Sequence, residues 1–352
     1  MIATVDMPSL AGLLNGESIP TIVDSYGRAF TYLRISVTDL CNLRCVYCMP
    51  EEGVPWLPRE EILRYEEIVT VVEAAAACGV NKIRITGGEP LVRKGLPDLI
   101  DKIARISGIT DLSMTTNGTL LADYASELKA VGLRRVNISL DTLDPAKFRR
   151  IARRGELHSV LEGIAAAESA NLHPVKLNMV VLRGVNDDEI EAFASLTANH
   201  RVQVRFIEVM PVGEVRDCAA KPNTMNHVSG TEVRARIERR FGSLEPVVST
   251  GRSNDPAQVW KIPGSVGTLG FIDAMSSAFC ARCNRLRLTA DGKLRSCLLQ
   301  GGELDVRPIL RSSSKGMRKQ LTAAFRKAAY EKPEYYSLWS GAAPGAMNRI
   351  GG

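Results

Sequence analysis

The chain has 352 residues, of which 45% are hydrophobic, and its formal net charge at pH 7 is +6. No apolar run approaches the roughly 18 residues of a membrane-spanning helix, and the first basic residue is Arg28, so neither a membrane protein nor a secretory signal is expected. The mild positive charge suits an anionic small molecule at least as well as nucleic acid, so the positions of the basic residues must decide.

Short β-rich runs alternate with helical runs from Tyr32 to about Glu208. Strands are predicted to begin at Tyr32, Lys82, Leu112, Arg135, Val175 and Val202. Helices are predicted over 64–78, 96–107, 121–131, 158–170 and 187–199. Gly79, Gly108 and Gly132 follow three of these helical runs, as helix C-caps do.

This alternation predicts an α/β fold with parallel strands and right-handed crossovers. Six units fall short of the eight in a complete barrel, so a partial, open β/α barrel is expected. We divide the chain into an N-terminal lead-in (1–30), the barrel (31–210) and a C-terminal extension (211–352) that covers the open side. Within the extension, an amphipathic helix is predicted over 231–241.

Cys41, Cys45 and Cys48 directly follow the first predicted strand, in the run C-N-L-R-C-V-Y-C. Three thiolates at this spacing can hold three corners of a 4Fe–4S cluster, which leaves the fourth iron open to a ligand other than protein. A structural zinc site usually needs four N or S ligands, and no His lies within about a hundred residues after Cys48. A disulfide is disfavoured because the chain reads as cytosolic, where thiols stay reduced.

Polar residues recur at every second position of the predicted strands. They include Arg34, Lys82, Arg84, Asn137, Ser139, Lys176, Asn178 and Arg205. Alternation places such residues on one strand face, and because helices cover the outside of this kind of barrel, that face must line the interior. Unpaired buried cations are costly, so an anionic ligand such as a triphosphate is expected there. Solvated edge strands or internal ion pairs are the alternatives.

A second cysteine set, Cys280, Cys283 and Cys297, lies in the extension. No His or Cys follows Cys297 to complete a zinc ribbon, so a second 4Fe–4S cluster with an open iron fits better than zinc. Arg285 and Arg287 share a strand face beside this set and suit a purine triphosphate, although R-L-R-L-T could also be a plain exposed strand. Of the remaining cysteines, Cys78 is a predicted core residue and Cys218 has no assigned role.

Together these motifs closely resemble the GTP 3′,8-cyclase family of molybdenum cofactor biosynthesis, within the radical S-adenosylmethionine superfamily. The resemblance runs from about Tyr32 to the final glycines. It rests on R-I-S-V-T-D-L-C-N-L-R-C-V-Y-C-M-P, R-I-T-G-G-E-P-L-V-R, T-T-N-G, N-I-S-L-D, R-F-I-E-V-M-P, F-C-A-R-C-N-R-L-R-L and Gly351-Gly352.

The resemblance implies two 4Fe–4S clusters, one on each cysteine set, with the first cluster cleaving S-adenosylmethionine and the second positioning guanine. The implied contacts to S-adenosylmethionine are Tyr47, Gly88, Ser139 and Met210. The implied contacts to GTP are Arg34, Lys82, Arg84, Thr115, Lys176, Arg205, Arg285 and Arg287. Residues implied to act in catalysis are Arg34, Arg285, Arg287, Gly351 and Gly352, with the glycine pair inserted in the active site. The alternative is that Gly351 and Gly352 form a disordered chain end that is dispensable for activity.

The resemblance further implies a cytoplasmic homodimer, an external one-electron donor of the flavodoxin or ferredoxin type, and cyclic pyranopterin monophosphate synthase as the downstream partner. It implies neither a membrane nor a nucleic-acid partner. Another radical S-adenosylmethionine enzyme, such as a peptide maturase with an auxiliary cluster, is the main alternative, although such enzymes typically carry more C-terminal cysteines. An RNA-binding iron–sulfur protein fits poorly, because aromatic residues make up only 5% of the chain.

Overall fold

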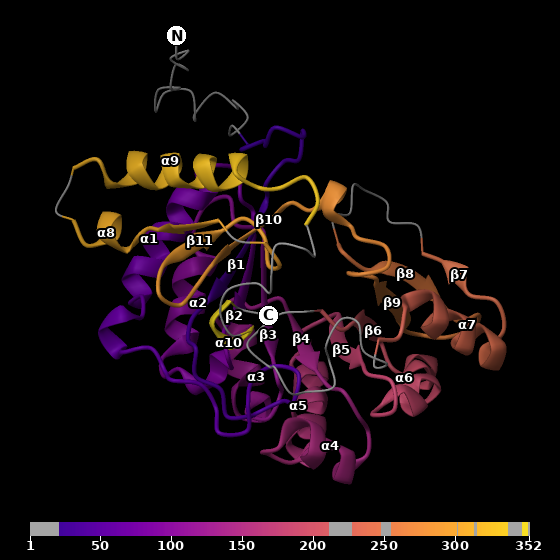
Figure 1. Cartoon of the computed structure of the whole chain (residues 1–352). Coiled ribbons are helices and arrows are strands. Elements are labelled where there is room, and N and C mark those ends of the chain that lie inside the picture. The colour runs from indigo at the N-terminus through magenta and orange to yellow at the C-terminus, as the bar shows by residue number, and fades with distance from the viewer. Residues whose placement is uncertain are drawn as a thin grey trace.

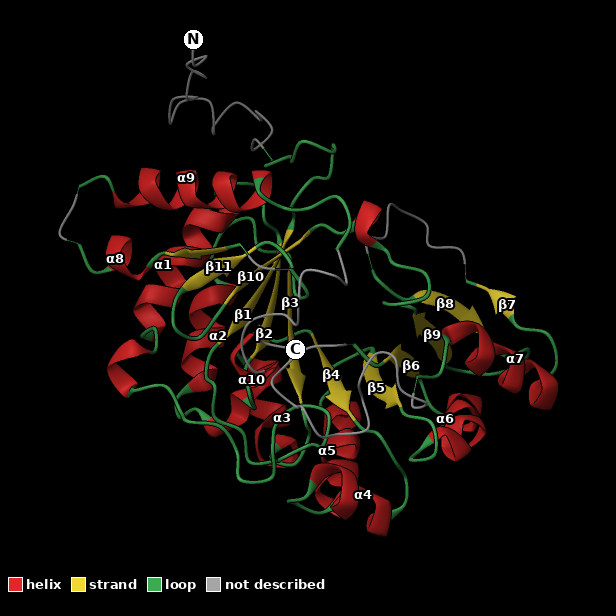
Figure 2. Cartoon of the chain, viewed as in Figure 1, coloured by secondary structure: helices red, strands yellow, loops and turns green. Residues whose placement is uncertain are grey.

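The computed structural model describes residues 21–210, 227–247, 255–300, 302–312, 315–336 and 347–350. Over these ranges the molecule is built on one sheet of 12 strands, in the order β12-β11-β10-β1-β2-β3-β4-β5-β6-β9-β8-β7 (Figures 1 and 2). The strands are β1 Tyr32–Ser36, β2 Lys82–Thr86, β3 Asp111–Thr116, β4 Arg135–Ser139, β5 Val175–Val181, β6 Val202–Glu208, β7 Glu245–Pro246, β8 Gln258–Lys261, β9 Thr268–Ile272, β10 Arg285–Leu288, β11 Lys293–Arg295 and β12 Glu303–Asp305.

Helices connect the central strands and pack side by side along one face of the sheet (Figure 2). These are α1 Tyr65–Ala76, α2 Leu96–Ala104, α3 Leu121–Ala130, α4 Pro145–Ala152, α5 Leu157–Ser169 and α6 Ile190–Ser195. The later part of the chain adds α7 Gly230–Phe241, α8 Arg307–Leu310, α9 Met317–Tyr330 and α10 Met347–Ile350. Among the described residues, no helix has the length and apolarity needed to cross a membrane.

The predicted α/β fold with an open, partial barrel is confirmed. Eight neighbouring strands, from β10 through β1–β6 to β9, run parallel, and the edge strands β12 and β7 do not pair with each other. The C-terminal extension was expected to cover the open side. Instead its strands lengthen the sheet at both edges, with β10 beside β1 and β9 beside β6.

Four helices are absent from the predicted elements: α4 in the barrel, and α8, α9 and α10 in the extension. The start of α4 illustrates what was missed. The sequence does contain a typical signal for the start of α4, an Asp followed by a Pro. In the structure, the Asp144 side chain caps the helix by accepting a hydrogen bond from the Lys147 backbone N–H at 2.6 Å, and Pro145 occupies the first helical position. The helix predicted over 187–199 is interrupted, with 3₁₀ turns on both sides of α6. The glycine ends are confirmed, since Gly79, Gly108 and Gly132 all have positive φ angles.

Alternation along the strands divides the molecule into a core and a cavity. Leu33, Ile35, Ile83 and Ile85 are fully buried in the hydrophobic core. Burying each such side chain stabilises the fold by about 1.5–3 kcal/mol. The residues between them, such as Arg34, face the other way and line a cavity inside the open barrel.

Candidate functional site

The cavity has a volume of about 400 Å³ and is lined by strands from the whole central sheet. It brings both cysteine sets and most predicted ligand residues together. Those that line it are Arg34, Cys41, Cys45, Tyr47, Cys48, Lys82, Arg84, Gly88, Thr115, Ser139, Arg205, Met210, Cys280, Cys283, Arg285, Arg287 and Cys297. Lys176 is joined to the lining through an ion pair with Asp255. Gly351, Gly352 and Cys218 lie outside the described residues, and Cys78 is buried in the core as predicted.

The first triad lies on the loop that follows β1. A tight turn brings Cys45 and Cys48 together, because the Cys48 backbone N–H donates to the Cys45 carbonyl at 2.9 Å. All three thiols are free and partly exposed, and they face the cavity. Burial raises the pKa of Cys41 to about 11 and that of Cys48 to about 12.

The turn after β2 packs against the loop that carries the first triad and is hydrogen-bonded to it. The Gly88 backbone N–H donates to the Thr38 carbonyl at 2.8 Å, and a Cβ on Gly88 would lie 2.2 Å from the Leu40 carbonyl oxygen. No other residue fits there without displacing the loop. Glu89 is fully buried and accepts a hydrogen bond from the Asn117 backbone N–H at 2.6 Å, which ties the same turn to the end of β3.

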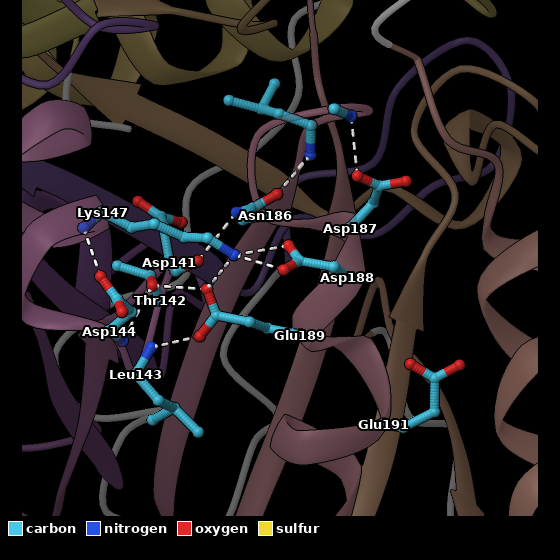
Figure 3. A network of polar contacts seen from close by, with 12 residues as sticks. Asp141, Thr142, Leu143, Asp144, Lys147, Asn186, Asp187, Asp188, Glu189 and Glu191 are labelled. Carbon is cyan, nitrogen blue, oxygen red and sulfur yellow. Dashed lines mark hydrogen bonds and ion pairs between the residues drawn. The ribbon is translucent and has the colours of Figure 1, made fainter.

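Tyr47 is held by a buried carboxylate on the neighbouring side of the barrel. Its hydroxyl donates to Asp141 Oδ2 at 2.7 Å, and Asp141 Oδ1 accepts from the Val180 backbone N–H at 2.9 Å. Figure 3 shows Asp141 within a larger polar network in which Asn186 donates to the Asp141 carbonyl and Lys147 lies between Asp188 and Glu189. Asp141 is absent from the predicted site residues, although its place directly after a strand, in N-I-S-L-D, could have marked it.

The second triad is assembled from distant parts of the chain. Cys283 closes a turn onto Cys280 through a backbone hydrogen bond of 3.0 Å, and β10 follows at once. Arg28, a buried residue near the start of the described chain, donates to the Cys280 carbonyl at 3.0 Å and to the Pro333 carbonyl at 2.8 Å. Lys332 donates to the carbonyls of Arg285 and Ser296 at 3.0 and 2.5 Å. Neither Arg28 nor Lys332 is among the predicted site residues.

The surroundings of the second triad are strongly cationic. Although burial opposes it, the charges of Arg285 and Lys332 lower the pKa of Cys283 to about 6. Burial, reinforced by the neighbouring Arg285, lowers the pKa of Arg287 to about 10. This side of the cavity therefore favours a thiolate ligand and anionic groups.

The donor geometry bears on what each triad can hold. Within the described ranges, no three His, Cys, Asp or Glu side chains stand close enough to bind a single metal ion. A 4Fe–4S cube binds each thiolate through a different iron, so its ligands need not converge on one point. The free, cavity-facing thiols of both triads fit such a group.

The inward cations are confirmed as cavity-lining, but an external anion is not the partner of all of them. Arg205 Nη2 and Lys176 Nζ lie 2.5 and 3.3 Å from Asp255 Oδ2. Against burial, these two cations hold the pKa of Asp255 below its usual range. The alternative of internal ion pairs is thus correct for this pair, and Asp255 could not be predicted because it lies outside the β–α units.

The helix α10 brings the chain end to the first triad, as its place beside β2 in Figure 1 shows. Asn348 is buried, lines the cavity and donates from Nδ2 to the Asp39 carbonyl at 2.8 Å. Ile350 packs against Met210 and Leu298.

Comparisons with known proteins agree with this architecture. Residues 35–197 match the model of the Radical SAM superfamily, and residues 202–338 match Molybdenum Cofactor Synthesis C. The chain is 50% identical to the GTP 3′,8-cyclase of Pelotomaculum thermopropionicum, over 90% of this chain and 96% of that protein. It is 48% identical to the GTP 3′,8-cyclase of Desulforamulus reducens, over 94% of this chain and 100% of that protein.

Among solved structures, the chain is similar in fold to Streptococcus suis SuiB bound to S-adenosylmethionine. The TM-score is 0.52 at 13% sequence identity, and the match covers 85% of this chain and 69% of SuiB. At that identity the likeness concerns the fold alone.

Proposed function

This chain belongs to the GTP 3′,8-cyclase family of radical S-adenosylmethionine enzymes, and we propose that it forms 3′,8-cyclo-7,8-dihydro-GTP in the cavity where its two cysteine triads meet. That product begins molybdenum cofactor biosynthesis. The observation that carries the proposal is that both triads and the inward-facing cations line one cavity. A peptide maturase is not supported, because the relatives at high identity and coverage are cyclases.

The first cluster is assigned to Cys41, Cys45 and Cys48, and the second to Cys280, Cys283 and Cys297. When bound and reduced, the first cluster would supply the electron that splits S-adenosylmethionine into methionine and a 5′-deoxyadenosyl radical. That radical would take the hydrogen atom from ribose C3′, and the resulting carbon radical would add to guanine C8. One further electron, from the external donor, and a proton would then complete the dihydro product. Contacts to S-adenosylmethionine are assigned to Tyr47, Gly88, Ser139 and Met210.

The cations of the cavity hold the substrate. GTP contacts are assigned to Arg34, Lys82, Arg84, Thr115, Lys176, Arg205, Arg285 and Arg287. Their task is placement, since the reacting carbons must be held in near-attack geometry while water and stray hydrogen donors are kept out. Arg34, Arg285 and Arg287 are assigned to the catalytic group, together with Gly351 and Gly352.

The partners follow from this chemistry. A flavodoxin- or ferredoxin-type donor supplies single electrons, and cyclic pyranopterin monophosphate synthase takes the product. The thiol ligands must stay reduced before cluster assembly, which suits the cytoplasm. We assign the barrel to 31–210 and the auxiliary-cluster extension to 211–352, and we propose that the enzyme works as a homodimer.

The proposed function is tested by anaerobic reconstitution with iron and sulfide, followed by dithionite, S-adenosylmethionine and GTP. The expected products are 5′-deoxyadenosine and the cyclised nucleotide. If no 5′-deoxyadenosine forms, the radical mechanism is wrong. If it forms while GTP remains unchanged, the enzyme acts on another substrate.

Arg285 and Arg287 are expected to anchor GTP rather than the fold. An arginine fork matches phosphate and purine acceptors, and a hydrogen bond from a charged donor contributes about 1.5–3 kcal/mol. Replacing either residue by alanine should raise the dissociation constant for GTP about tenfold to a hundredfold, measured by anaerobic calorimetry, with iron content unchanged. Arg282→Ala is the matched control, because Arg282 is an exposed arginine of the same segment. Unchanged GTP affinity accompanied by loss of folding would favour the plain-strand alternative.

Asp255 is expected to compete with the triphosphate. Its carboxylate already occupies Arg205 and Lys176, so GTP must displace it from these cations. Asp255→Asn should therefore tighten GTP binding by about tenfold, the value of one modest charged contact, and should lower the melting temperature of the ligand-free protein. The control Asp188→Asn removes an exposed carboxylate that pairs with Lys147, and neither residue lines the cavity. Weaker GTP binding in Asp255→Asn would show that this carboxylate supports the substrate.

A further inference from the structure

One fully buried amide in the cavity wall has no partner. Asn137 lies in the middle of β4, is 0% exposed and lines the cavity. Among the described residues, neither its Oδ1 nor its Nδ2 has a hydrogen-bond partner. Buried polar groups are nearly always paired, because an unpaired one loses its hydrogen bonds to water without replacement. An amide with both ends unpaired therefore indicates a ligand that the cavity is built to receive.

Strand register gives the place of this amide within the site. Asn137 is directly opposite Thr115 on β3 and Lys176 on β5. Thr115 Oγ1 is also buried without a partner among the described residues. Ser139 lies two residues further along β4 on the same face. Asn137 is thus between a residue assigned to S-adenosylmethionine and residues assigned to GTP.

The hydrogen-bonding capacity of the Asn137 amide indicates which part of the nucleotide it can bind. Phosphate oxygens only accept hydrogen bonds at neutral pH, so a phosphate would leave Oδ1 unsatisfied. A vicinal diol satisfies both ends, because one hydroxyl accepts from Nδ2 while the other donates to Oδ1. The guanine edge also offers a donor and an acceptor, but guanine is assigned to the second triad, beside β10, and β1, β2 and β3 separate that strand from β4.

We propose that Asn137 binds the 2′- and 3′-hydroxyls of the substrate ribose and thereby selects ribonucleotides over deoxyribonucleotides. The inference rests on the proposed function, since it concerns the same substrate. A site that hydrogen-bonds a substrate hydroxyl rejects the analogue lacking it, because the polar group of the protein is then left unpaired. The same contacts would fix the orientation of the ribose carbon from which hydrogen is taken.

The test compares GTP with 2′-deoxy-, 3′-deoxy- and 2′,3′-dideoxy-GTP in binding to the reconstituted protein, by anaerobic calorimetry without S-adenosylmethionine or reductant. The wild type should bind GTP at least tenfold more tightly than the dideoxy analogue. Asn137→Leu should bind all four nucleotides with similar affinity, near that of the wild type for dideoxy-GTP. Asn117→Ala, which removes a cavity-lining amide whose Nδ2 and Oδ1 both have protein partners, should keep the preference for GTP.

A second measurement separates a ligand-directed amide from a structural one. Leucine has the same number and branching of side-chain heavy atoms as asparagine and removes the unpaired polar group, and the adjoining cavity has room for its larger methyl groups. The ligand-free Asn137→Leu protein should therefore melt at a temperature equal to or above that of the wild type. A clearly lower melting temperature, or a retained preference for GTP over the dideoxy analogue, would overturn the assignment of Asn137. A wild type that binds GTP without this preference would also overturn it. A wild type that binds no GTP at all would instead refute the proposed function.

Discussion

Replacing Cys41, Cys45 and Cys48 together by alanine is expected to abolish 5′-deoxyadenosine formation. It should lower the iron content from about eight to about four atoms per chain, as for the loss of one of two cubanes. The three thiols are free and face the cavity from one loop, so removing them deletes every protein ligand of the first site. GTP binding should persist, because the cationic wall and the second triad are untouched. Iron analysis, electron paramagnetic resonance and product chromatography measure these outcomes.

The matched control is the triple alanine variant of Cys280, Cys283 and Cys297. It should also hold about four irons, yet it should still cleave S-adenosylmethionine while producing no cyclised GTP. Zinc in place of iron, or an unchanged iron content in the first variant, would contradict the cluster assignment.

Deleting Gly351 and Gly352 is expected to abolish the cyclised product while both clusters, GTP binding and cleavage of S-adenosylmethionine remain. The physical basis is the docking of α10, where Asn348 bonds the Asp39 carbonyl in the loop of the first triad. Ile350, which directly precedes the glycine pair in the sequence, packs against the cavity-lining residues Met210 and Leu298. Liquid chromatography of 5′-deoxyadenosine and of the nucleotide product separates the two activities.

The double substitution Gly351→Ala with Gly352→Ala distinguishes chain length from crowding. If backbone must approach the reacting groups closely, added Cβ atoms should impair product formation nearly as much as deletion. A deletion variant with the wild-type rate of product formation would show that the glycine pair is dispensable.

The parallel strands, their inward cations and both cysteine sets could be predicted from local patterns. When helices cover one face of a strand, apolar and polar residues alternate along it. Ile83 and Ile85 are buried under the helices, and Arg84 between them lines the cavity. The cysteine spacing is equally local. Each of these features depends on residues close together in the sequence, so each can be predicted before the structure is known.

Contacts between distant segments could not be predicted in this way. Asp255 lies outside the β–α rhythm, yet it pairs with Arg205 across 50 residues of sequence. The bond from Tyr47 to Asp141 spans 94 residues. Nothing in a short window specifies such a partner, because the partner is set by how the strands align. The orphaned amide of Asn137 is a related case, since its burial and lack of a partner exist only once neighbouring strands surround it.

The bonds of Arg28 have a consequence for how the molecule is made. They join parts of the chain separated by 252 residues at Cys280 and by 305 residues at Pro333. The surroundings of the second triad therefore cannot be complete until nearly the whole polypeptide has left the ribosome. The turns that hold Cys41, Cys45 and Cys48 are synthesised far earlier, although α10 reaches them only at the end. Closing such long loops costs more chain entropy than closing the short turns of the first triad, so the surroundings of the second triad are expected to form later in folding.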